Sequence, residues 1–409
     1  MTVRITKPEF NLREKISELD KPSGLKGTEI MRSETSQEAR DLISAGRRNL
    51  IINGSMAVAQ RATSVAAQSF SSPSYPVCDR WQLRSGGLDQ ANFDVSQQND
   101  APGGVCTKSI KVDVNAAESA LSSGEYLWIA QTLEAQNCSD LGFGDSGASD
   151  LTISFYVKSN VTGIYSMYLY SQDPNRSISR TYTIDTSGQW ERKIIHIPGD
   201  TGGSSINHDN GIGIKIYWHL LAGSDYQSSN ATNWQTHNGN ATAYGHEVNI
   251  ATSTSNYWQL TGVQVERGSN ATEFENRSFG EELALCQRYF QSNFPEGVAP
   301  QNGYYNANSG LAAGFNGAVA FATNQLRSPH IMFKPKMNHQ PDVTLYSASS
   351  DDTDNRWAAY NSSWSSGSSN SIDYFGSNGF GVRYPSGGIS ATTGEAYLYR
   401  GMWAADAEI

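Results

Sequence analysis

The side chains that could perform covalent chemistry are few and scattered along the chain. Hydrolysis of an acyl or glycosyl bond needs an activated nucleophile with its base, or two carboxylates on either side of the scissile bond. Neither a GxSxG nor an HExxH sequence occurs, and the glycine-rich residues 199–203 lack the Lys-Ser/Thr pair of a phosphate-binding loop. We therefore predict a protein that is not an enzyme and holds no cofactor. Carboxylates brought together from distant strands are the open alternative.

Metal binding is the next chemistry that the histidines, cysteines and acidic residues could support. In the adjacent pairs His208-Asp209 and His246-Glu247, neighbouring strand residues would point to opposite faces. The four cysteines are Cys78, Cys106, Cys138 and Cys286. Their spacing is too wide for a zinc knuckle or a CxxC redox pair. We predict no metal site, histidines in solvated loops and four buried thiols, with two disulfides as the alternative.

Two long polar loops carry aromatic and amide side chains that could bind a sugar. An aromatic ring stacks on the C–H face of a pyranose, and Asn or Gln amides hydrogen-bond its hydroxyls. One loop spans residues 222–246, and the other spans residues 351–371 and includes Trp357 and Tyr360. The predicted glycan-contact residues are Tyr226, Trp234, Tyr244 and Trp364. The alternative is that these rings only pin the loops to the domain beneath them.

The composition of the whole chain indicates a β-rich protein. Of 409 residues, 38% are hydrophobic and only 17% are charged, with 38 Gly, 20 Tyr and 9 Trp. Many Tyr and Trp among small polar residues favour antiparallel sheets joined by polar loops. The net charge of −10, without a Lys/Arg cluster, argues against a nucleic-acid partner. We expect no membrane insertion, because no run of about 18 apolar residues occurs, and the charged start MTVRITKPEF is unlike a secretory signal.

Charge is concentrated in the first 50 residues, which hold 10 Lys+Arg and 8 Asp+Glu but only one aromatic residue. Apolar residues recur there at helical spacing and form two short stripes. They are Phe10, Leu12, Ile16, Leu19, Leu42 and Ile43. So short a segment cannot bury these stripes on itself. We predict that residues 1–48 form a helical attachment segment that docks on another protein; the alternative is a helical hairpin packed on its own sandwich.

From residue 49 the hydrophobic period changes to two, which is typical of half-buried strands. The alternation is clear in residues 151–158 and 212–220. In residues 257–265 the apolar face shifts at Gly262, which predicts a β-bulge. About eight such strands predict a jelly-roll β-sandwich over residues 49–278.

The last third of the chain begins with a short helical pattern. In residues 279–296 we predict a helical connector with Leu283, Cys286 and Phe290 on one side. Pro295 and the Gly/Asn-rich run after it predict a linker or hinge. Strand patterns then resume and predict a second, smaller β-sandwich over residues 297–409. The predicted fold class is therefore mainly β, with a short helical N-terminal segment.

Four stretches of the sequence resemble the tail-fibre and receptor-binding proteins of bacteriophages, especially those of marine bacterial hosts. KPEFNLREKISELDKPSGLKG resembles a virion-attachment segment. GRRNLIINGSMAVAQRATS, followed by DRWQL, resembles the opening strands of a fibre jelly roll. YWQLTGVQVERGSNATEFENRSFGEELALCQRYF resembles its closing strand and trailing helix, and YLYRGMWAADAEI resembles the last strand of a tip module. The jelly roll is also similar to carbohydrate-binding modules.

The resemblance implies a virion protein that is made in the host cytoplasm and released by lysis. It implies a homotrimeric tail fibre that attaches to other virion proteins through its N-terminus and contacts host-surface polysaccharide through its β domains. The first alternative is a capsid decoration or tail-shaft protein built from the same modules. The second alternative is a glycan depolymerase.

Overall fold

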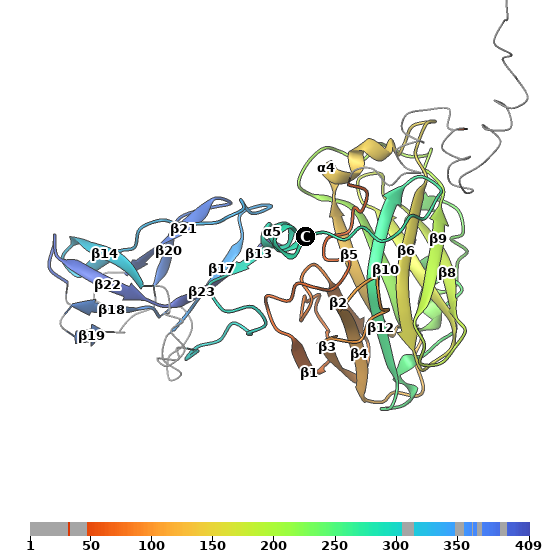
Figure 1. Ribbon diagram of the computed structural model, residues 1–409, viewed down its shortest axis with the longest axis horizontal. Helices are drawn as coiled ribbons and strands as arrows, with labels where there is room; N and C mark the ends of the chain where they lie inside the picture. The colour runs from red at the N-terminus through yellow and green to blue at the C-terminus, as the bar shows by residue number, and fades with distance from the viewer. Residues whose placement is uncertain are drawn as a thin grey trace, which may run out of the picture. The chain divides into compact units, whose positions relative to one another are not determined.

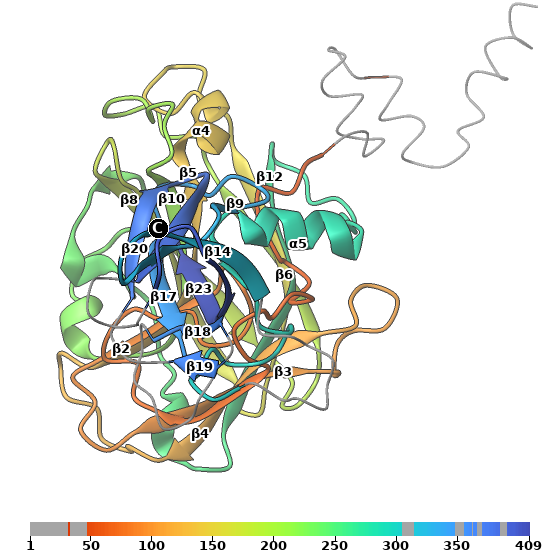
Figure 2. The ribbon, with the colours of Figure 1, turned by 90° about the vertical axis from the view of Figure 1, so that its left-hand side faces the viewer.

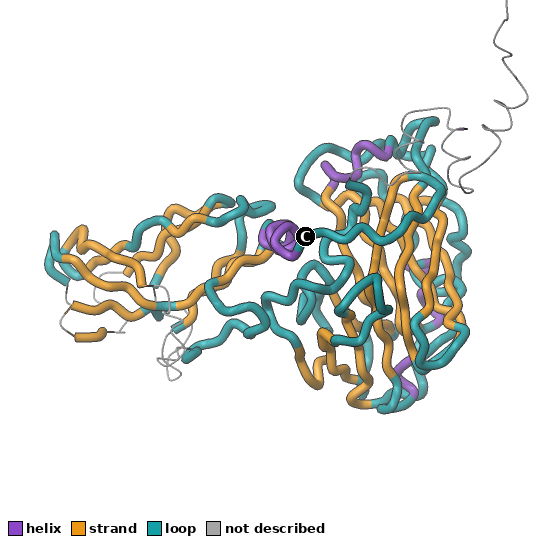
Figure 3. Tube along the Cα trace, in the orientation of Figure 1, coloured by secondary structure: helices purple, strands orange, loops and turns teal. Residues whose placement is uncertain are grey.

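The computed structural model describes residue 32 and residues 47–304, 315–347, 356–361, 363–365, 370–384 and 391–409. Contacts along the chain group Met1–Arg48 and Asn49–Ile409 into separate units, and every described strand belongs to the second. The six apolar residues of the predicted attachment segment (residues 1–48) lie outside the described residues. Figure 3 shows that strands and loops make up most of the described chain and that its helices are short.

Two six-stranded antiparallel sheets form a β-sandwich (Figure 1). In order across the first sheet, its strands are β1 (Ser64–Gln68), β3 (Asn92–Gln98), β4 (Ser109–Ala116), β12 (Tyr257–Arg267), β6 (Leu151–Ser159) and β9 (Glu191–Ile197). The strands of the second sheet are β11 (Gln235–Thr236), β8 (Arg176–Ile184), β7 (Gly163–Ser171), β10 (Ile212–Ala222), β5 (Tyr126–Glu134) and β2 (Gln82–Gly86). The predicted mainly-β fold class is confirmed.

The core between the two sheets follows from the period-two alternation. Leu151, Ile153, Phe155 and Val157 of β6 all point into one continuous apolar cluster. Trp218 of β10 lies in the same cluster, 5.6 Å from the ring of Trp81. Burying such side chains stabilises the fold by about 1.5–3 kcal/mol each. The four cysteines are buried and free, as predicted.

Gly262 produces the shift in the apolar face of β12. The pairing of β12 with β6 changes register between Thr261 and Gln264, which confirms the predicted bulge. Gly262 has a φ of +59°, and a Cβ there would lie 2.9 Å from a ring carbon of Tyr156. Glycine is therefore needed both for the backbone conformation and for the space.

Short helical turns connect the strands. They are α4 (Ala135–Cys138), η1 (Ser139–Leu141), η2 (Ser224–Tyr226), η3 (Gly239–Ala241) and η4 (Ile250–Thr252). The longer helix α5 (Phe279–Gln287) is seen from the side in Figure 2. It begins at a capping box between Ser278 and Glu281. This helix ends three residues before Phe290, which the sequence pattern placed on its apolar face. Phe290 instead begins the strand β13 (Phe290–Ser292), because its backbone pairs with Asp406 near the end of the chain.

Smaller antiparallel sheets follow α5. The first joins β13, β23 (Met402–Asp406) and β17 (Asp342–Tyr346). The second contains β14 (Phe315–Ala322), β15 (Gln325–Arg327), β16 (Ile331–Met332), β18 (Ala358–Asn361), β19 (Ser363–Ser365), β20 (Ser371–Gly376), β21 (Gly379–Tyr384) and β22 (Ala396–Arg400). Trp357, from the second predicted binding loop, is fully buried beside Tyr399 in their core, with the rings 5.8 Å apart.

A buried network of charges joins the end of the chain to the sandwich. The guanidinium group of Arg80 is fully buried, pairs with Glu408 and lies 3.4 Å from the centre of the Tyr289 ring. Arg61 pairs with Glu408 at 3.2 Å and with Asp406 at 3.0 Å. These contacts connect residues that are more than 300 positions apart in the sequence.

A second cluster of the same kind surrounds Glu134 at the end of β5. Arg288 donates to both of its carboxylate oxygens, at 2.7 and 3.0 Å, and the Tyr289 hydroxyl donates to one of them as well. Burial would raise the pKa of Glu134, but these hydrogen bonds lower it below its ordinary value. The carboxylate therefore remains ionised where α5 ends.

Glu408→Gln should destabilise the protein strongly. The variant leaves two mostly buried guanidinium groups without their shared carboxylate, and such a loss costs about 3–5 kcal/mol. We expect the free energy of unfolding in urea to fall by about 3 kcal/mol. Glu247→Gln, at an exposed position, is the control and should change it by less than about 0.5 kcal/mol. Equal unfolding midpoints for the two variants would contradict a stabilising role for the network.

Candidate functional site

The outer face of the second sheet is unusually aromatic. Along β2, β5, β10 and β7, residues such as Leu83, Ile129, Ile216 and Met167 point into the core. The residues between them point away from it, because successive strand side chains alternate between faces. We call the following outward-facing set the aromatic platform: Arg84, Tyr126, Trp128, Tyr168, Tyr170, Lys215 and Tyr217.

Strand register places these residues side by side in rows. In one row, Tyr217 of β10 lies opposite Tyr168 of β7 and opposite the small Ala130 of β5. In the neighbouring rows, Trp128 is opposite Arg84 and Lys215 is opposite Tyr170. Directly opposed residues lie about 4.5–5.5 Å apart, so the rings and cations form one continuous surface.

The rings hold one another in place. Tyr217 lies perpendicular to Trp128 with ring centres 5.0 Å apart, and it is tilted against Tyr168 at 5.8 Å. Trp128 and Tyr168 are 8% and 2% exposed, whereas Tyr126, Tyr170 and Tyr217 are half-buried. The half-buried rings are therefore rigid and still present an accessible surface, which suits a stacking contact with a ligand.

Several polar groups of the platform have no hydrogen-bond partner within the described part of the chain. These groups are the hydroxyls of Tyr126 and Tyr217, the indole N–H of Trp128 and the guanidinium group of Arg84, whose Nε is buried. Burial raises the pKa of the Tyr217 hydroxyl, which keeps it protonated and able to donate. A ligand with several hydroxyl groups could satisfy these donors and acceptors at once.

Lys215 is the cation at the centre of the platform. Its Nζ lies 5.0 Å from the ring centre of Trp128 and 5.2 Å from that of Tyr217, and it donates to Gln82. Burial, together with the positive charges of Arg84 and Arg80, lowers its pKa to about 8. Lys215 is therefore charged at neutral pH, and no carboxylate among the described residues pairs with its ammonium group.

The polar loop of residues 222–246 borders the platform and contains three of the four predicted glycan-contact residues. Tyr226 packs edge-on against Tyr126, with ring centres 5.1 Å apart. Trp234 packs instead on Phe143 at 5.4 Å, and its indole N–H donates to the carbonyl of Pro198 at 2.6 Å. Of the predicted glycan-contact residues in this loop, Tyr226 is the one with a ring contact to the platform among the described residues.

The other two predicted contact residues lie elsewhere. Tyr244 is half-buried in the turn after η3. Trp364 belongs to β19, where its backbone pairs with Tyr360 of β18, and its side chain is outside the described residues. Tyr226 therefore borders the second sheet of the sandwich, whereas Trp364 belongs to the larger C-terminal sheet. The four predicted residues do not form a single site.

Two histidines near the loop correct the prediction of solvated histidines. His219 and His246 are both buried, with ring centres 6.4 Å apart. His246 accepts from the Ser166 backbone N–H at 3.1 Å and donates to the Val248 carbonyl at 2.7 Å. Burial lowers its pKa to about 4, so it is neutral at physiological pH. It acts as an anchor that fixes the end of the loop to β7.

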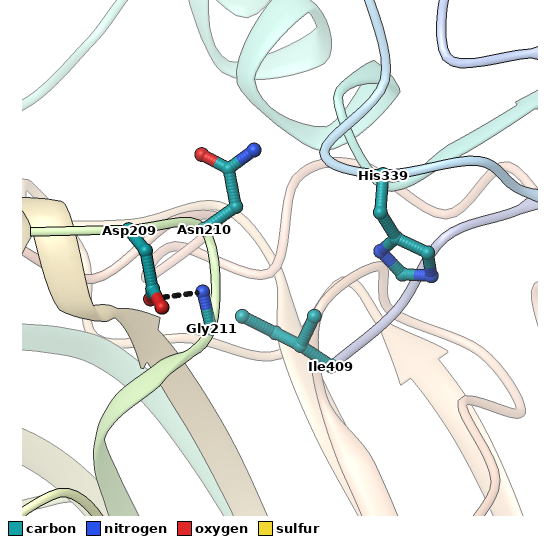
Figure 4. Close-up of a pocket in the computed structure, with 5 residues that line it drawn as sticks. All are labelled: Asp209, Asn210, Gly211, His339 and Ile409. Carbon is teal, nitrogen blue, oxygen red and sulfur yellow. Dashed lines mark hydrogen bonds between the residues drawn. The ribbon is translucent and has the colours of Figure 1, made fainter.

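A separate pocket of about 560 Å³ lies beside Ile409 (Figure 4). Its other lining residues are Asp209, Asn210, Gly211 and His339. The Asp209 carboxylate already accepts from the backbone N–H of Gly211 at 2.7 Å, as the dashed line in Figure 4 shows. This pocket offers a single ring, the exposed imidazole of His339, whereas the platform gathers several aromatic rings and is the stronger candidate for ligand binding.

In the part of the chain that the structure describes, no three His, Cys, Asp or Glu side chains gather as a metal site. No described helix is both long and apolar enough to cross a membrane.

The fold is similar to several solved structures at low sequence identity. A tailspike protein of bacteriophage CBA120, described as an enzymatically active domain, aligns over 54% of this chain and 21% of its own, with 13% identity and a TM-score of 0.29. The chain therefore spans about a fifth of that tailspike. A putative sugar-binding protein of Bacteroides thetaiotaomicron aligns over 54% of this chain and 100% of its own, with 11% identity and a TM-score of 0.31.

A family 11 carbohydrate-binding module of Clostridium thermocellum, in complex with a mixed-linked tetrasaccharide, is a third example. It aligns over 52% of this chain and 100% of its own, with 12% identity and a TM-score of 0.25. Neither a protein-family model nor a curated protein sequence matches the chain.

The platform was not predicted from the sequence, because the period-two alternation indicated the core face alone. In IGIKIYWHLLA the apolar alternation marks a half-buried strand, and the positions between are Lys215, Tyr217 and His219 rather than Ser or Thr. Aromatic residues also occupy the outward positions on either side of a core leucine in residues 126–128 and 168–170. Aromatic residues at outward positions of several strands could have indicated a binding face.

Trp234→Ala should lower stability, because this ring joins the loop to the sandwich. Removing a half-buried Trp that also donates a hydrogen bond costs about 2 kcal/mol. We expect a lower midpoint of thermal unfolding, measured by differential scanning calorimetry. The neighbouring exposed residue provides the control variant Asn233→Ala, which should unfold like the wild type. Unchanged stability combined with weaker glycan binding would instead make Trp234 a contact residue.

Proposed function

We propose that this chain is a non-enzymatic structural protein of a bacteriophage virion, a tail fibre that binds host-surface glycan through the aromatic platform. The observation that carries glycan binding is the pair of half-buried tyrosines, Tyr126 and Tyr217, whose hydroxyl groups have no hydrogen-bond partner among the described residues. Tyr126 and Tyr217 offer ring surface for the C–H face of a sugar and hydroxyls for its polar edge. Such sites recognise pyranoses by stacking and hydrogen bonding together.

The virion location rests on the sequence. Four stretches that extend from residue 7 to residue 409 resemble tail-fibre proteins, and the first 50 residues differ sharply in charge from the rest. In this proposal residues 1–48 attach the protein to the particle and the β domains project from it. A capsid decoration or tail-shaft protein would share these features, and labelling of intact particles in electron microscopy distinguishes a head location from a tail location.

Assembly as a homotrimer is supported by an apolar surface on the larger C-terminal sheet. Val319 and Leu398 are 56% and 45% exposed, and Phe321 and Tyr360 are exposed beside them on β14 and β18. β22 pairs with both of these strands, and a hollow of about 590 Å³ is lined by Val319, Tyr360 and Leu398. An exposed apolar surface of this kind is typical of an interface with another chain.

Tyr217→Ala should weaken glycan binding without unfolding the sandwich. We expect a loss of about tenfold or more in affinity, which corresponds to about 1.4 kcal/mol. Affinity electrophoresis in gels that contain host polysaccharide measures the binding, and near-UV circular dichroism checks the fold. Tyr156→Ala, a half-buried tyrosine on the opposite sheet, is the matched control.

Equal retardation of Tyr217→Ala and the wild type would rule out the platform as the glycan site. Release of reducing ends from the same polysaccharide by wild-type protein would show that the protein is a depolymerase.

Val319→Lys combined with Leu398→Lys should dissociate the trimer. Two ammonium groups in an apolar interface are unpaired and costly to desolvate. Size-exclusion chromatography with light scattering should give the mass of three chains for the wild type and of one chain for the double variant. Ile194→Lys, an equally exposed apolar position on β9, is the control. A monomeric wild-type protein would contradict the proposed assembly.

A further inference from the structure

Two cations of the aromatic platform lack a negative partner. Arg84 on β2 and Lys215 on β10 lie on either side of β5, whose Trp128 is opposite Arg84 and within 5.0 Å of Lys215. Among the described residues, no carboxylate pairs with either side chain. The guanidinium of Arg84 is 5.9 Å from the ring of Tyr126, and its Nε is buried without a hydrogen-bond partner.

The opposite sheet shows how this chain treats a comparable lysine. Lys111 lies over the ring of Tyr257 at 4.8 Å, as Lys215 lies over Tyr217. Lys111, however, also pairs with Asp113 at 2.7 Å. A lysine above a tyrosine ring is thus neutralised on one face of the sandwich and left unneutralised on the other.

Two buried carboxylates that contact the strands of the platform are already engaged. Glu134, which ends β5, accepts from Arg288 and Tyr289. Glu408 pairs with Arg80, which lies just before β2, and with Arg61. The positive charge of Arg84 and Lys215 therefore remains available to a ligand.

We propose that the glycan bound by the platform is acidic, with the anionic group of one sugar held between Arg84 and Lys215 and a neighbouring sugar stacked on Tyr217. This inference rests on the proposed glycan-binding function and specifies the class of glycan. Carboxylate or sulfate groups suit the two cations, because hydrogen bonds between ionised partners are shorter and stronger than neutral ones.

Desolvation explains why an anion should contribute strongly at this position. Burial is the main cause that lowers the pKa of Lys215 to about 8, which means that the folded protein already holds its charge at a cost. An anionic sugar compensates that charge where the dielectric constant is low, and a neutral sugar cannot.

A nucleic acid would also combine negative charge with stacking bases, but the overall charge opposes it. The chain has a formal net charge of −10, and the excess of acidic residues lies after residue 50. Extended phosphate backbones bind through many Lys and Arg contacts, whereas the platform offers two. A single-stranded oligonucleotide is therefore included among the probes.

The test compares acidic oligosaccharides with their own carboxyl-reduced forms. Galacturonate, glucuronate and mannuronate oligomers are printed on an array beside the reduced oligomers and the oligonucleotide (dT)12. Full-length wild-type protein is applied, together with Lys215→Met, Arg84→Gln and the matched control Lys111→Met. Methionine retains most of the aliphatic stem of lysine, so the packing on Trp128 is largely kept while the charge is lost.

We expect the wild type and Lys111→Met to bind at least one acidic oligomer about tenfold more tightly than its reduced form. Lys215→Met and Arg84→Gln should each reduce that ratio towards one, because affinity for the acidic oligomer should fall further than affinity for the reduced form. Equal binding of acidic and reduced oligomers by the wild type would overturn the acidic preference and leave glycan binding intact. Binding to (dT)12 in place of every sugar, or to no probe at all, would overturn both proposals.

Discussion

The hydrogen-bonded register of β2, β5, β10 and β7 determines both the core and the candidate site. Each strand has only two faces, so a register that buries Trp218 and Ile216 must also present Tyr217 on the other side. A slip of one residue would exchange the two faces and expose the tryptophan. The core therefore fixes the positions of the platform residues, and the ring contacts among Tyr217, Trp128 and Tyr168 add rigidity to an arrangement that the backbone already imposes.

The two charge clusters have a different role from the platform cations. Arg80 and Arg288 are surrounded by carboxylates and tyrosine rings, and their contacts join β2, β5, α5 and the end of the chain after β23. Lys215 and Arg84 lie on the same sheet face but have no carboxylate partners among the described residues. Removing one partner of a buried ion pair destabilises a fold, so the two clusters have a structural role, whereas the unpaired cations belong to the proposed ligand surface. Whether a cation is paired depends on whether its side chain reaches the carboxylate of Glu134 or Glu408. These two carboxylates come from distant parts of the chain.

Local patterns predicted much of the fold. Alternating residues such as Ile153 and Phe155 identified strands because the extended backbone has a period of two, and Gly262 identified a bulge because only glycine tolerates that conformation without a clash. The end of the helix before Phe290 was less predictable. Phe290 begins a strand only because its backbone pairs with Asp406, 116 positions later. His246 and Trp234 lie in a polar loop and look exposed in the sequence, yet both are packed against the sandwich.

By itself, the sequence determined the β-rich class, the strand periodicity, the buried thiols and the charge boundary near residue 50, because these depend on composition and on residues close in the chain. Only the tertiary structure decided which aromatic residues lie together in the aromatic platform. Tyr126, Tyr168 and Tyr217 come from three strands separated by about 40–50 residues, and their proximity follows from sheet order and register. Long-range pairing of that kind leaves no local signature, since many orders of the same strands satisfy the same alternation.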